Sequence, residues 1–223
     1  MKIVILARAG SFLFLLAPMP VSAQIPDGRN EPRHKIVMEN EYVRLLDGLV
    51  PVMDTTLTHT HSENSVVLFL TNSTFGLKNV DERPVVAEVR PGEAVYRAYG
   101  DKSVTHKVWN QSATVFHFMV VELLKRHSAN DTCTILPQPI WKLQWQNKLV
   151  RVYKFEIGRG NKYKLSKSNC AYLMIDVSGT IIATSSGNSS SLNANGFAFF
   201  PPQSDIEIRG NNKYSQCVLL ELK

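Results

Sequence analysis

The sequence is poor in several features that define particular classes of protein. Three cysteines in 223 residues are too few for a disulfide scaffold, and 12 Gly and 11 Pro are too few for a collagen-like chain. Charged residues make up only 20% of the chain and hydrophobic residues 44%, which excludes a coiled coil or a wholly disordered chain. These values predict an ordinary globular protein with one large domain or two small ones, each able to bury a core.

Charge of one sign and long hydrophobic runs are also scarce. The formal net charge is +6, but the basic residues form no arginine-rich stripe and do not alternate with aromatics, so we predict no nucleic-acid partner. The apolar run at residues 11–17 is far shorter than the ~20 residues that a bilayer span requires, and no later stretch comes close. The sequence therefore predicts no membrane anchor.

The N-terminus has the pattern of an export signal. Two basic residues precede the apolar run, two prolines follow it, and Val21 and Ala23 supply the small residues that a signal peptidase requires at −3 and −1. We therefore predict a cleaved signal peptide over residues 1–23 and a secreted or periplasmic protein. The alternative interpretation is a buried N-terminal helix. Residues 24–33 are expected to form an exposed arm.

Export would allow disulfides to form, but the three cysteines are an odd number, so at least one thiol is unpaired or intermolecular. Cys170 and Cys217 both lie in the last third of the chain, and a bridge between them is conceivable. Cys133 would then be the remaining cysteine.

An internal repeat divides the chain into two similar halves. Residues 40–47 resemble residues 147–154, and residues 120–123 resemble residues 219–222. Both halves also show the same order of alternating segments and turns between these anchors, which favours a duplicated domain. Arg44 matches Arg151 in this repeat, and the match indicates a shared structural role, such as pairing across the two halves.

The hydrophobic periodicity within each half is two. Short segments rich in β-branched and aromatic residues are bounded by Asn, Gly, Ser, Asp or Pro turns, which predicts an all-β protein made of sandwiches or small barrels. These segments are residues 43–50, 65–70, 85–89, 115–123, 149–157, 172–177 and 181–184. The Ser- and Asn-rich stretch at residues 187–195 is expected to be a mobile loop.

Three of the six histidines support a metal-site hypothesis. His59 and His61 stand at i and i+2, which on a strand places both imidazoles on one face, where they could bind one metal ion. A third histidine, His106, follows later in the same half. Three imidazoles inside a small barrel leave a coordination position open to water or substrate, as catalytic metal sites do. The alternative is a pair of surface or hydrogen-bonded strand histidines.

The segments around these histidines resemble the two signature motifs of the cupin superfamily. The matching residues are His59-Thr-His61 and the strand at 66–70, then Arg90-Pro-Gly92-Glu-Ala, Gly100, His106-x-x-x-Asn110 and the closing segment 120–123. Cupins are antiparallel double-stranded β-helices, or jelly rolls, so the resemblance and the repeat imply two tandem cupin barrels, a bicupin. The implied domains are residues 34–126, a linker at 127–139, and residues 140–223. The resemblance also implies a divalent transition metal ion (Fe, Mn, Ni, Zn or Cu) on His59, His61 and His106.

The sequence departs from the cupin motifs at one ligand. The usual first motif has a Glu ligand four or five residues after the second His, where this chain has Ser65 or Val66. Glu63 comes earlier, and it shares the alternation of His59 and His61 only if the strand stays regular. It could therefore be a fourth ligand, a general base or a solvated turn residue.

The second half contains no histidine at the corresponding positions, near residues 164–168 and 205–207. The C-terminal barrel is therefore expected to hold no metal of this type, and to cover the flank of the first barrel and shield its strand edges. His117 lies in an apolar run, where it is either an inward neighbour of the metal or a core histidine.

The second motif also contains aromatic residues and one cation that could line a pocket. Tyr96, Arg97, Tyr99 and Trp109 would suit an aromatic or carboxylate-bearing small molecule, although Tyr and Trp at this spacing are also typical of a core.

Two functions of different class are consistent with these residues. One is a secreted metal-dependent enzyme in which Glu63 or Tyr99 moves protons, and resemblance to quercetinase-like cupin dioxygenases implies oxygenation of a small organic molecule. The other is a non-catalytic protein that binds a small molecule or a metal ion. The sequence leaves the metal, the substrate and the oligomeric state open.

Overall fold

The computed structural model describes residues 25–124, 133 and 135–223. Apart from one short 3-10 turn, η1 (Gly28–Asn30), the regular elements of these residues are all strands, which confirms the all-β prediction. The predicted signal peptide and part of the predicted linker lie outside the described residues. Within the described part, no helix is long and apolar enough to cross a membrane.

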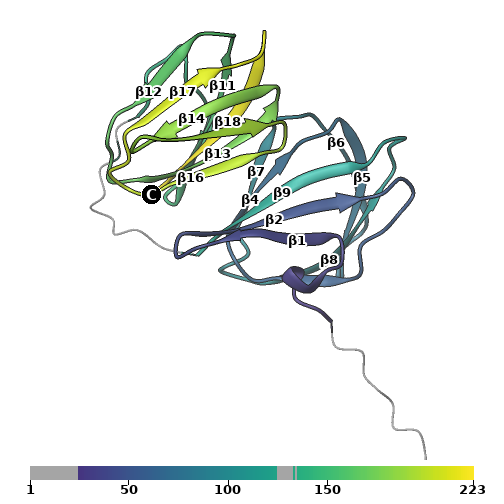
Figure 1. Ribbon diagram of the computed structural model, residues 1–223. Helices are drawn as coiled ribbons and strands as arrows, with labels where there is room; N and C mark the ends of the chain where they lie inside the picture. Colours follow the sequence, from purple (N-terminus) through teal and green to yellow (C-terminus); the bar gives the residue numbers. More distant parts are fainter. Residues whose placement is uncertain (1–24, 125–132, 134) are drawn as a thin grey trace, which may run out of the picture.

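Two sheets form the N-terminal barrel (Figure 1), with strand orders β1-β2-β9-β4-β7 and β3-β8-β5-β6. The strands are β1 (His34–Glu39), β2 (Val43–Val50), β3 (His59–His61), β4 (Ser65–Phe69), β5 (Ser73–Asn79), β6 (Val85–Val89), β7 (Ala94–Arg97), β8 (Val104–Asn110) and β9 (Phe116–Leu123).

The C-terminal barrel repeats this arrangement, with strand orders β10-β11-β18-β13-β16 and β12-β17-β14-β15. Its strands are β10 (Lys142–Gln146), β11 (Val150–Ile157), β12 (Lys162–Leu165), β13 (Ala171–Ser178), β14 (Thr180–Ser185), β15 (Asn188–Asn193), β16 (Phe197–Phe200), β17 (Ile206–Gly210) and β18 (Ser215–Leu222). Adding nine to each strand number of the first barrel reproduces the order of the second. The predicted tandem jelly-roll architecture is therefore present.

The register of the central strands repeats as well. Val43 pairs with Leu123 between β2 and β9, and Val150 pairs with Leu222 between β11 and β18. The turns before β2 and β11 also match, because the Asn40 and Asn147 side chains each accept two backbone N–H bonds there. The weak sequence repeat therefore corresponds to a structural one.

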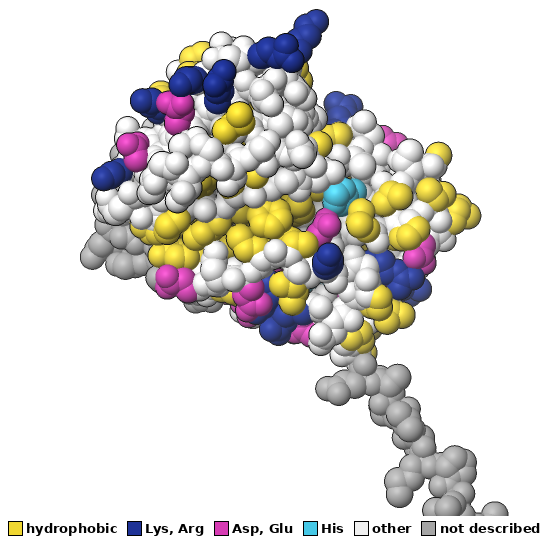
Figure 2. All heavy atoms as spheres, viewed as in Figure 1, with side chains coloured by type: hydrophobic (Ala, Val, Ile, Leu, Met, Phe, Trp, Pro, Cys, Tyr) yellow, Lys and Arg dark blue, Asp and Glu magenta, His cyan; other side chains and the backbone are white. Residues whose placement is uncertain are grey.

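A shared apolar layer joins the two five-stranded sheets face to face, so that the barrels lie side by side (Figure 1). Apolar side chains are visible at the surface along this junction (Figure 2). The buried members are Val43, Leu45, Val66, Leu68, Leu70, Ala94, Met119, Val121 and Leu123 from the first barrel and Val150, Val152, Ala171, Leu173, Ile175, Val177, Val218, Leu220 and Leu222 from the second. The second barrel thus covers a sheet face of the first. It also contacts the edge strand β7, because Trp145 Nε1 donates to the Ala94 carbonyl and Gln144 Nε2 donates to the Gly92 carbonyl just before that strand.

The matched arginines pair within each barrel and not across the two. Arg44 Nη1 lies 2.6 Å from Glu122 Oε2, and Arg151 Nη1 lies 2.8 Å from Glu221 Oε2. Both glutamates are buried. The shared structural role is therefore a buried ion pair at the same place in each barrel, and the expected pairing across the halves is wrong.

The conceivable Cys170–Cys217 bridge is also wrong, because the disulfide joins Cys133 to Cys170 and leaves Cys217 as a buried thiol. Cys217 lies opposite Asp176 in the β13–β18 register. That position is six residues along the strand from Cys170, or about 20 Å, which is far beyond the reach of a disulfide.

The Ser- and Asn-rich stretch forms a strand rather than the expected mobile loop. β15 pairs with β14 along its whole length through a two-residue turn at Ser186 and Gly187, which have φ angles of 51° and 80°. Positive φ at both turn residues is typical of a type I′ hairpin, whose twist suits two antiparallel strands. The turn geometry therefore sets the register although most side chains of β15 are polar and exposed.

Candidate metal site

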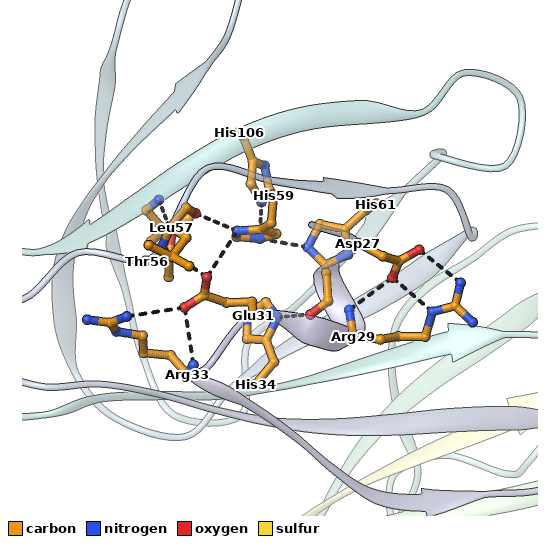
Figure 3. A network of polar contacts seen from close by, with 12 residues as sticks. Asp27, Arg29, Glu31, Arg33, His34, Thr56, Leu57, His59, His61 and His106 are labelled. Carbon is orange, nitrogen blue, oxygen red and sulfur yellow. Dashed lines mark hydrogen bonds and ion pairs between the residues drawn. The ribbon is translucent and has the colours of Figure 1, made fainter. Parts of the chain in front are cut away.

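The structure brings together the three histidines that the sequence singled out. His59 and His61 both point into the first barrel from β3, and His106 lies directly opposite His59 on β8. The Nε2 atom of His59 lies 3.1 Å from His61 Nε2 and 3.2 Å from His106 Nε2. All three side chains are buried. Figure 3 shows the imidazoles converging.

A fourth histidine, His34 on β1, joins this cluster and was missed by the sequence analysis. Its ring centroid lies 5.0 Å from that of His59 and 5.7 Å from that of His61, and the three form a group that could hold a metal ion. His34 lies far from the cupin-like motifs in sequence. The sequence analysis placed His34 only at the start of the first domain, and the closure of the barrel brings it to the site.

Backbone carbonyls fix the orientation of two of these rings. His59 Nδ1 lies 2.8 Å from the Leu57 carbonyl oxygen, and His34 Nδ1 lies 2.8 Å from the Gly28 carbonyl oxygen. A carbonyl can only accept, so in each ring Nδ1 carries the proton and Nε2 keeps its lone pair. A hydrogen bond from the nitrogen that does not face the metal is typical of metal-binding histidines.

The segment before β1 packs over the histidines and is not the exposed arm that we expected. Thr60 donates a backbone N–H to the Pro26 carbonyl, and the Glu31 side chain, 1% exposed, accepts backbone N–H bonds from Leu57 and Arg33. A Cβ atom on Gly28 would lie 2.6 Å from the His61 ring, so only glycine fits this approach. Figure 3 shows the contacts of Glu31 with Leu57 and Arg33.

Burial keeps the four imidazoles neutral. Loss of solvent lowers the pKa of His34 to about 4, of His106 to about 3 and of His61 to about 2, and it also lowers the pKa of His59. Neighbouring imidazoles lower the pKa further at His34, His61 and His106. A neutral imidazole is the form that binds a metal ion, because protonation removes the lone pair.

Two of the nitrogen separations fit a single transition metal ion. Two nitrogens at about 2.0–2.1 Å from one ion, separated by about 90–109°, lie about 2.8–3.4 Å apart. The Nε2 separations of 3.1 and 3.2 Å fall within this range. In the described part of the chain, His106 Nδ1 is buried without a hydrogen-bond partner, so this third ring lacks the carbonyl contact that orients His59 and His34.

The histidines form part of the wall of a cavity of about 50 Å³, measured as the space open to the centre of a water molecule. Most of the remaining wall is apolar, and its polar members are Ser65, Arg97 and Tyr99. The apolar lining residues are Val67, Phe69, Phe75, Leu77, Val108, Phe116, Phe118 and Val120.

The two residues that we predicted to move protons are placed differently. The Tyr99 ring stacks on His61 with centroids 5.6 Å apart, and burial raises the pKa of its phenol. Glu63 lies in the bend between β3 and β4, and it is not among the residues lining the cavity. Because β3 ends at His61, the regular strand that would have turned Glu63 toward the histidines is absent.

Other residues of the cupin-like motifs serve the fold. Asn110 Nδ2 donates to three backbone carbonyls, which ties β8 to neighbouring loops. Outside the cavity, His117 Nε2 lies 2.6 Å from Asp47 Oδ1. Of the two residues at the position of the usual Glu ligand, Ser65 faces the cavity, whereas Val66 faces the apolar layer between the barrels.

The C-terminal barrel has a hydrophobic interior where the first barrel has its histidines. The strand pair that corresponds to β3 and β8 is β12 and β17, and there Leu165 lies opposite Ile206, both buried. Fifteen buried hydrophobic residues fill the described interior of this barrel. Apolar side chains therefore stand where the first barrel has its histidines, among the described residues of this barrel.

Comparison with known proteins supports the fold. No protein-family model matches the chain, and no curated protein matches it. Among solved structures, it is similar to a cupin 2 conserved barrel domain protein from Leptotrichia buccalis, with 7% identity over 85% of this chain and 88% of that one and a TM-score of 0.55. It is also similar to a salicylate 1,2-dioxygenase from Pseudaminobacter salicylatoxidans, with 8% identity over 87% of this chain and 77% of that one and a TM-score of 0.62. For the 11S globulin procruciferin from Brassica napus, the identity is 6% over 82% of this chain and 77% of that one, with a TM-score of 0.63.

Identities this low show a shared fold and not a shared activity. The chain therefore has the cupin fold, in the form of two tandem barrels. This confirms the resemblance on which the domain and site predictions were based.

Proposed function

We propose that the chain is an extracytoplasmic metal-binding bicupin whose first barrel uses one divalent transition metal ion to act on a small organic molecule. The observation that supports this most directly is that His59 Nε2 lies within 3.2 Å of the Nε2 atoms of both His61 and His106, inside a buried cavity. His34 is available as a fourth nitrogen ligand in place of the usual Glu.

Each group in the cavity would have a separate task. When bound, the metal ion would supply Lewis-acid or redox chemistry at a ligand oxygen. The carbonyls of Leu57 and Gly28 hold the His59 and His34 rings in the metal-binding tautomer. The Tyr99 phenol, stacked beside His61, is the nearest candidate to hold or donate a proton, and the apolar wall would exclude water.

One observation favours a second function, the non-catalytic binding of a small molecule or metal ion. Among the described residues, no Asp or Glu lines the cavity, so the usual acidic ligand and a carboxylate base are both missing from its wall. A binding protein needs neither group.

Elemental analysis of the untagged mature protein tests the metal site. We expect about one equivalent of a transition metal, and none in a His59→Ala/His61→Ala double variant. The matched control is His117→Ala, which removes a histidine outside the cavity and should leave the metal content unchanged. No metal in the wild-type protein, even after reconstitution, would contradict the proposal. Oxygen uptake that depends on the bound metal would then separate an enzyme from a binding protein.

A further inference from the structure

Ser65 and Arg97 are adjacent polar residues on the cavity wall. They are register partners on the antiparallel strands β4 and β7, and both line the cavity. Directly opposed residues on one face of a sheet have Cβ atoms about 4.5–5.5 Å apart, so both side chains can reach one small ligand. Neither residue has a role in holding the metal in the proposed function.

Both side chains lack a partner within the described residues. Ser65 is 0% exposed and its Oγ makes no hydrogen bond, although a buried hydroxyl normally has a partner. No carboxylate of the described chain forms an ion pair with Arg97, whereas Arg44 and Arg151 are both paired. A cation and an unsatisfied donor therefore lie side by side on an otherwise mostly apolar wall.

This pair suits an anion with two oxygen atoms. A guanidinium presents parallel N–H donors that match a carboxylate, and a serine hydroxyl adds one more donor. Arg97 lines the same cavity as Tyr99 and His106, which places its side chain beside the histidine cluster. A ligand held at this pair would thus extend toward the metal position.

The size of the cavity limits the rest of the ligand. About 50 Å³ is open to water centres, whereas a cavity that holds benzene has a volume of about 150 Å³. The apolar lining would contact a hydrocarbon segment. We propose that Ser65 and Arg97 bind the carboxylate of a short-chain aliphatic carboxylic acid of about two to four carbons. The assignment rests on the proposed function, because the acid would occupy the same cavity as the metal.

The test compares propionate with its neutral isostere propionamide by ligand-observed NMR titration, on metal-free and metal-loaded full-length mature protein. We expect Arg97→Met to weaken propionate binding at least about tenfold and to leave the weaker propionamide binding unchanged, since a charge-assisted bidentate contact is lost. Ser65→Ala should weaken propionate binding about two- to fivefold. Arg83→Met, which removes an exposed arginine outside the cavity, is the control for net charge.

Three results would overturn the assignment: propionate binding equal in wild type and Arg97→Met, an equal loss in Arg83→Met, or an equal loss for propionamide. Thermal unfolding verifies that Arg97→Met is folded, and Ser65→Ala provides a second test if it is not. The metal content is measured on the same samples. Propionate binding that needs Arg97 in a protein that takes up no metal would defeat only the proposed function, whereas metal uptake with propionate binding insensitive to Arg97 would defeat only this inference.

Discussion

The two barrels share one framework and differ in what fills it. The buried ion pairs Arg44–Glu122 and Arg151–Glu221 occupy the same place in both. In the first barrel, Ser65 on β4 pairs with Glu122 on β9 and with Arg97 on β7. At the same place in the second barrel, Tyr172 on β13 pairs with Glu221 on β18 and with Phe200 on β16.

The residues that differ between the barrels are those that fill the interior. In the second barrel, Tyr172 fills the space next to Glu221 and donates to its carboxylate, and the interior is closed by apolar side chains. In the first barrel, the small Ser65 leaves a cavity that His34, His59, His61 and His106 reach. The comparison indicates that a conserved framework of strands and ion pairs carries the fold, while a few inward positions decide whether the barrel has a site.

The largest expected difference between the barrels is metal-dependent stability. Added transition metal should raise the free energy of unfolding of the wild-type chain, by about 4 kcal/mol at a concentration 1,000 times the Kd. His59→Ala/His61→Ala should lose this gain, whereas His117→Ala should keep it. Thermal and chemical unfolding with and without metal measure the effect. A gain that persists in the double variant would place the metal elsewhere.

Removing the shared ion pair tests whether the framework is equivalent in the two barrels. Arg44→Met and Arg151→Met each leave a buried glutamate without its cation, which should cost about 3–5 kcal/mol of unfolding free energy. Arg97→Met removes an arginine that has no ion pair and should cost much less. Urea denaturation of the three variants checks this. A cost below about 1 kcal/mol for either framework arginine would show that the pairs are not equivalent.

A buried acid distinguishes the second barrel at neutral pH. Asp176, at the position of Phe69 in the first barrel, is 0% exposed, and burial raises its pKa from 3.8 to about 6. The pKa of Asp176 is higher in the folded chain than in the unfolded one, so ionisation of this carboxyl favours unfolding. The stability that its neutral form contributes below pH 4 is therefore lost as the pH rises through about 6.

Asp176→Asn removes this ionisation. It should stabilise the protein at pH 7 by at most about 3 kcal/mol, and the gain should shrink toward pH 4. Unfolding free energies measured between pH 4 and pH 8 test the prediction. Asp205→Asn, at an exposed position, is the control and should change stability by less than about 0.5 kcal/mol. A pH-independent gain for Asp176→Asn would contradict the assignment.

The smallest expected effect concerns the matched positions Ser65 and Tyr172. Ser65→Ala removes a buried hydroxyl that has no partner and should leave stability unchanged or raise it by up to about 1 kcal/mol. Tyr172→Phe removes the hydroxyl that donates to Glu221 over 3.3 Å and should cost about 1 kcal/mol. Comparison of the melting temperatures is sufficient. A loss of stability in Ser65→Ala would show that its hydroxyl has a partner.

Part of the site was predictable because its residues carry local patterns. His59 and His61 alternate on one strand, and the second motif brings His106 to the neighbouring strand. His34 and the turn around Gly28 could not be found this way, since neither has a spacing that relates it to the motifs. Glu63 was judged from an alternation that ends at His61, and a strand end depends on its hydrogen-bonded partners.

Pairings between distant residues were the least predictable. The disulfide partner of Cys170 and the strand at residues 188–193 both depend on register and turn geometry rather than on composition. Arg44 and Arg151 were recognised as equivalent, but their partners became clear only once β9 and β18 lay beside them.

The sequence by itself determined the strand periodicity, the duplication and the identity of three histidines, because each is written in neighbouring residues or in a repeat. Only the tertiary structure decided that His34 joins them, that Ser65 and Arg97 face the same cavity, and that the second barrel covers a sheet face of the first. Those features are contacts between residues far apart in the chain, and closure of the barrels and burial of the apolar layer between them bring these residues together.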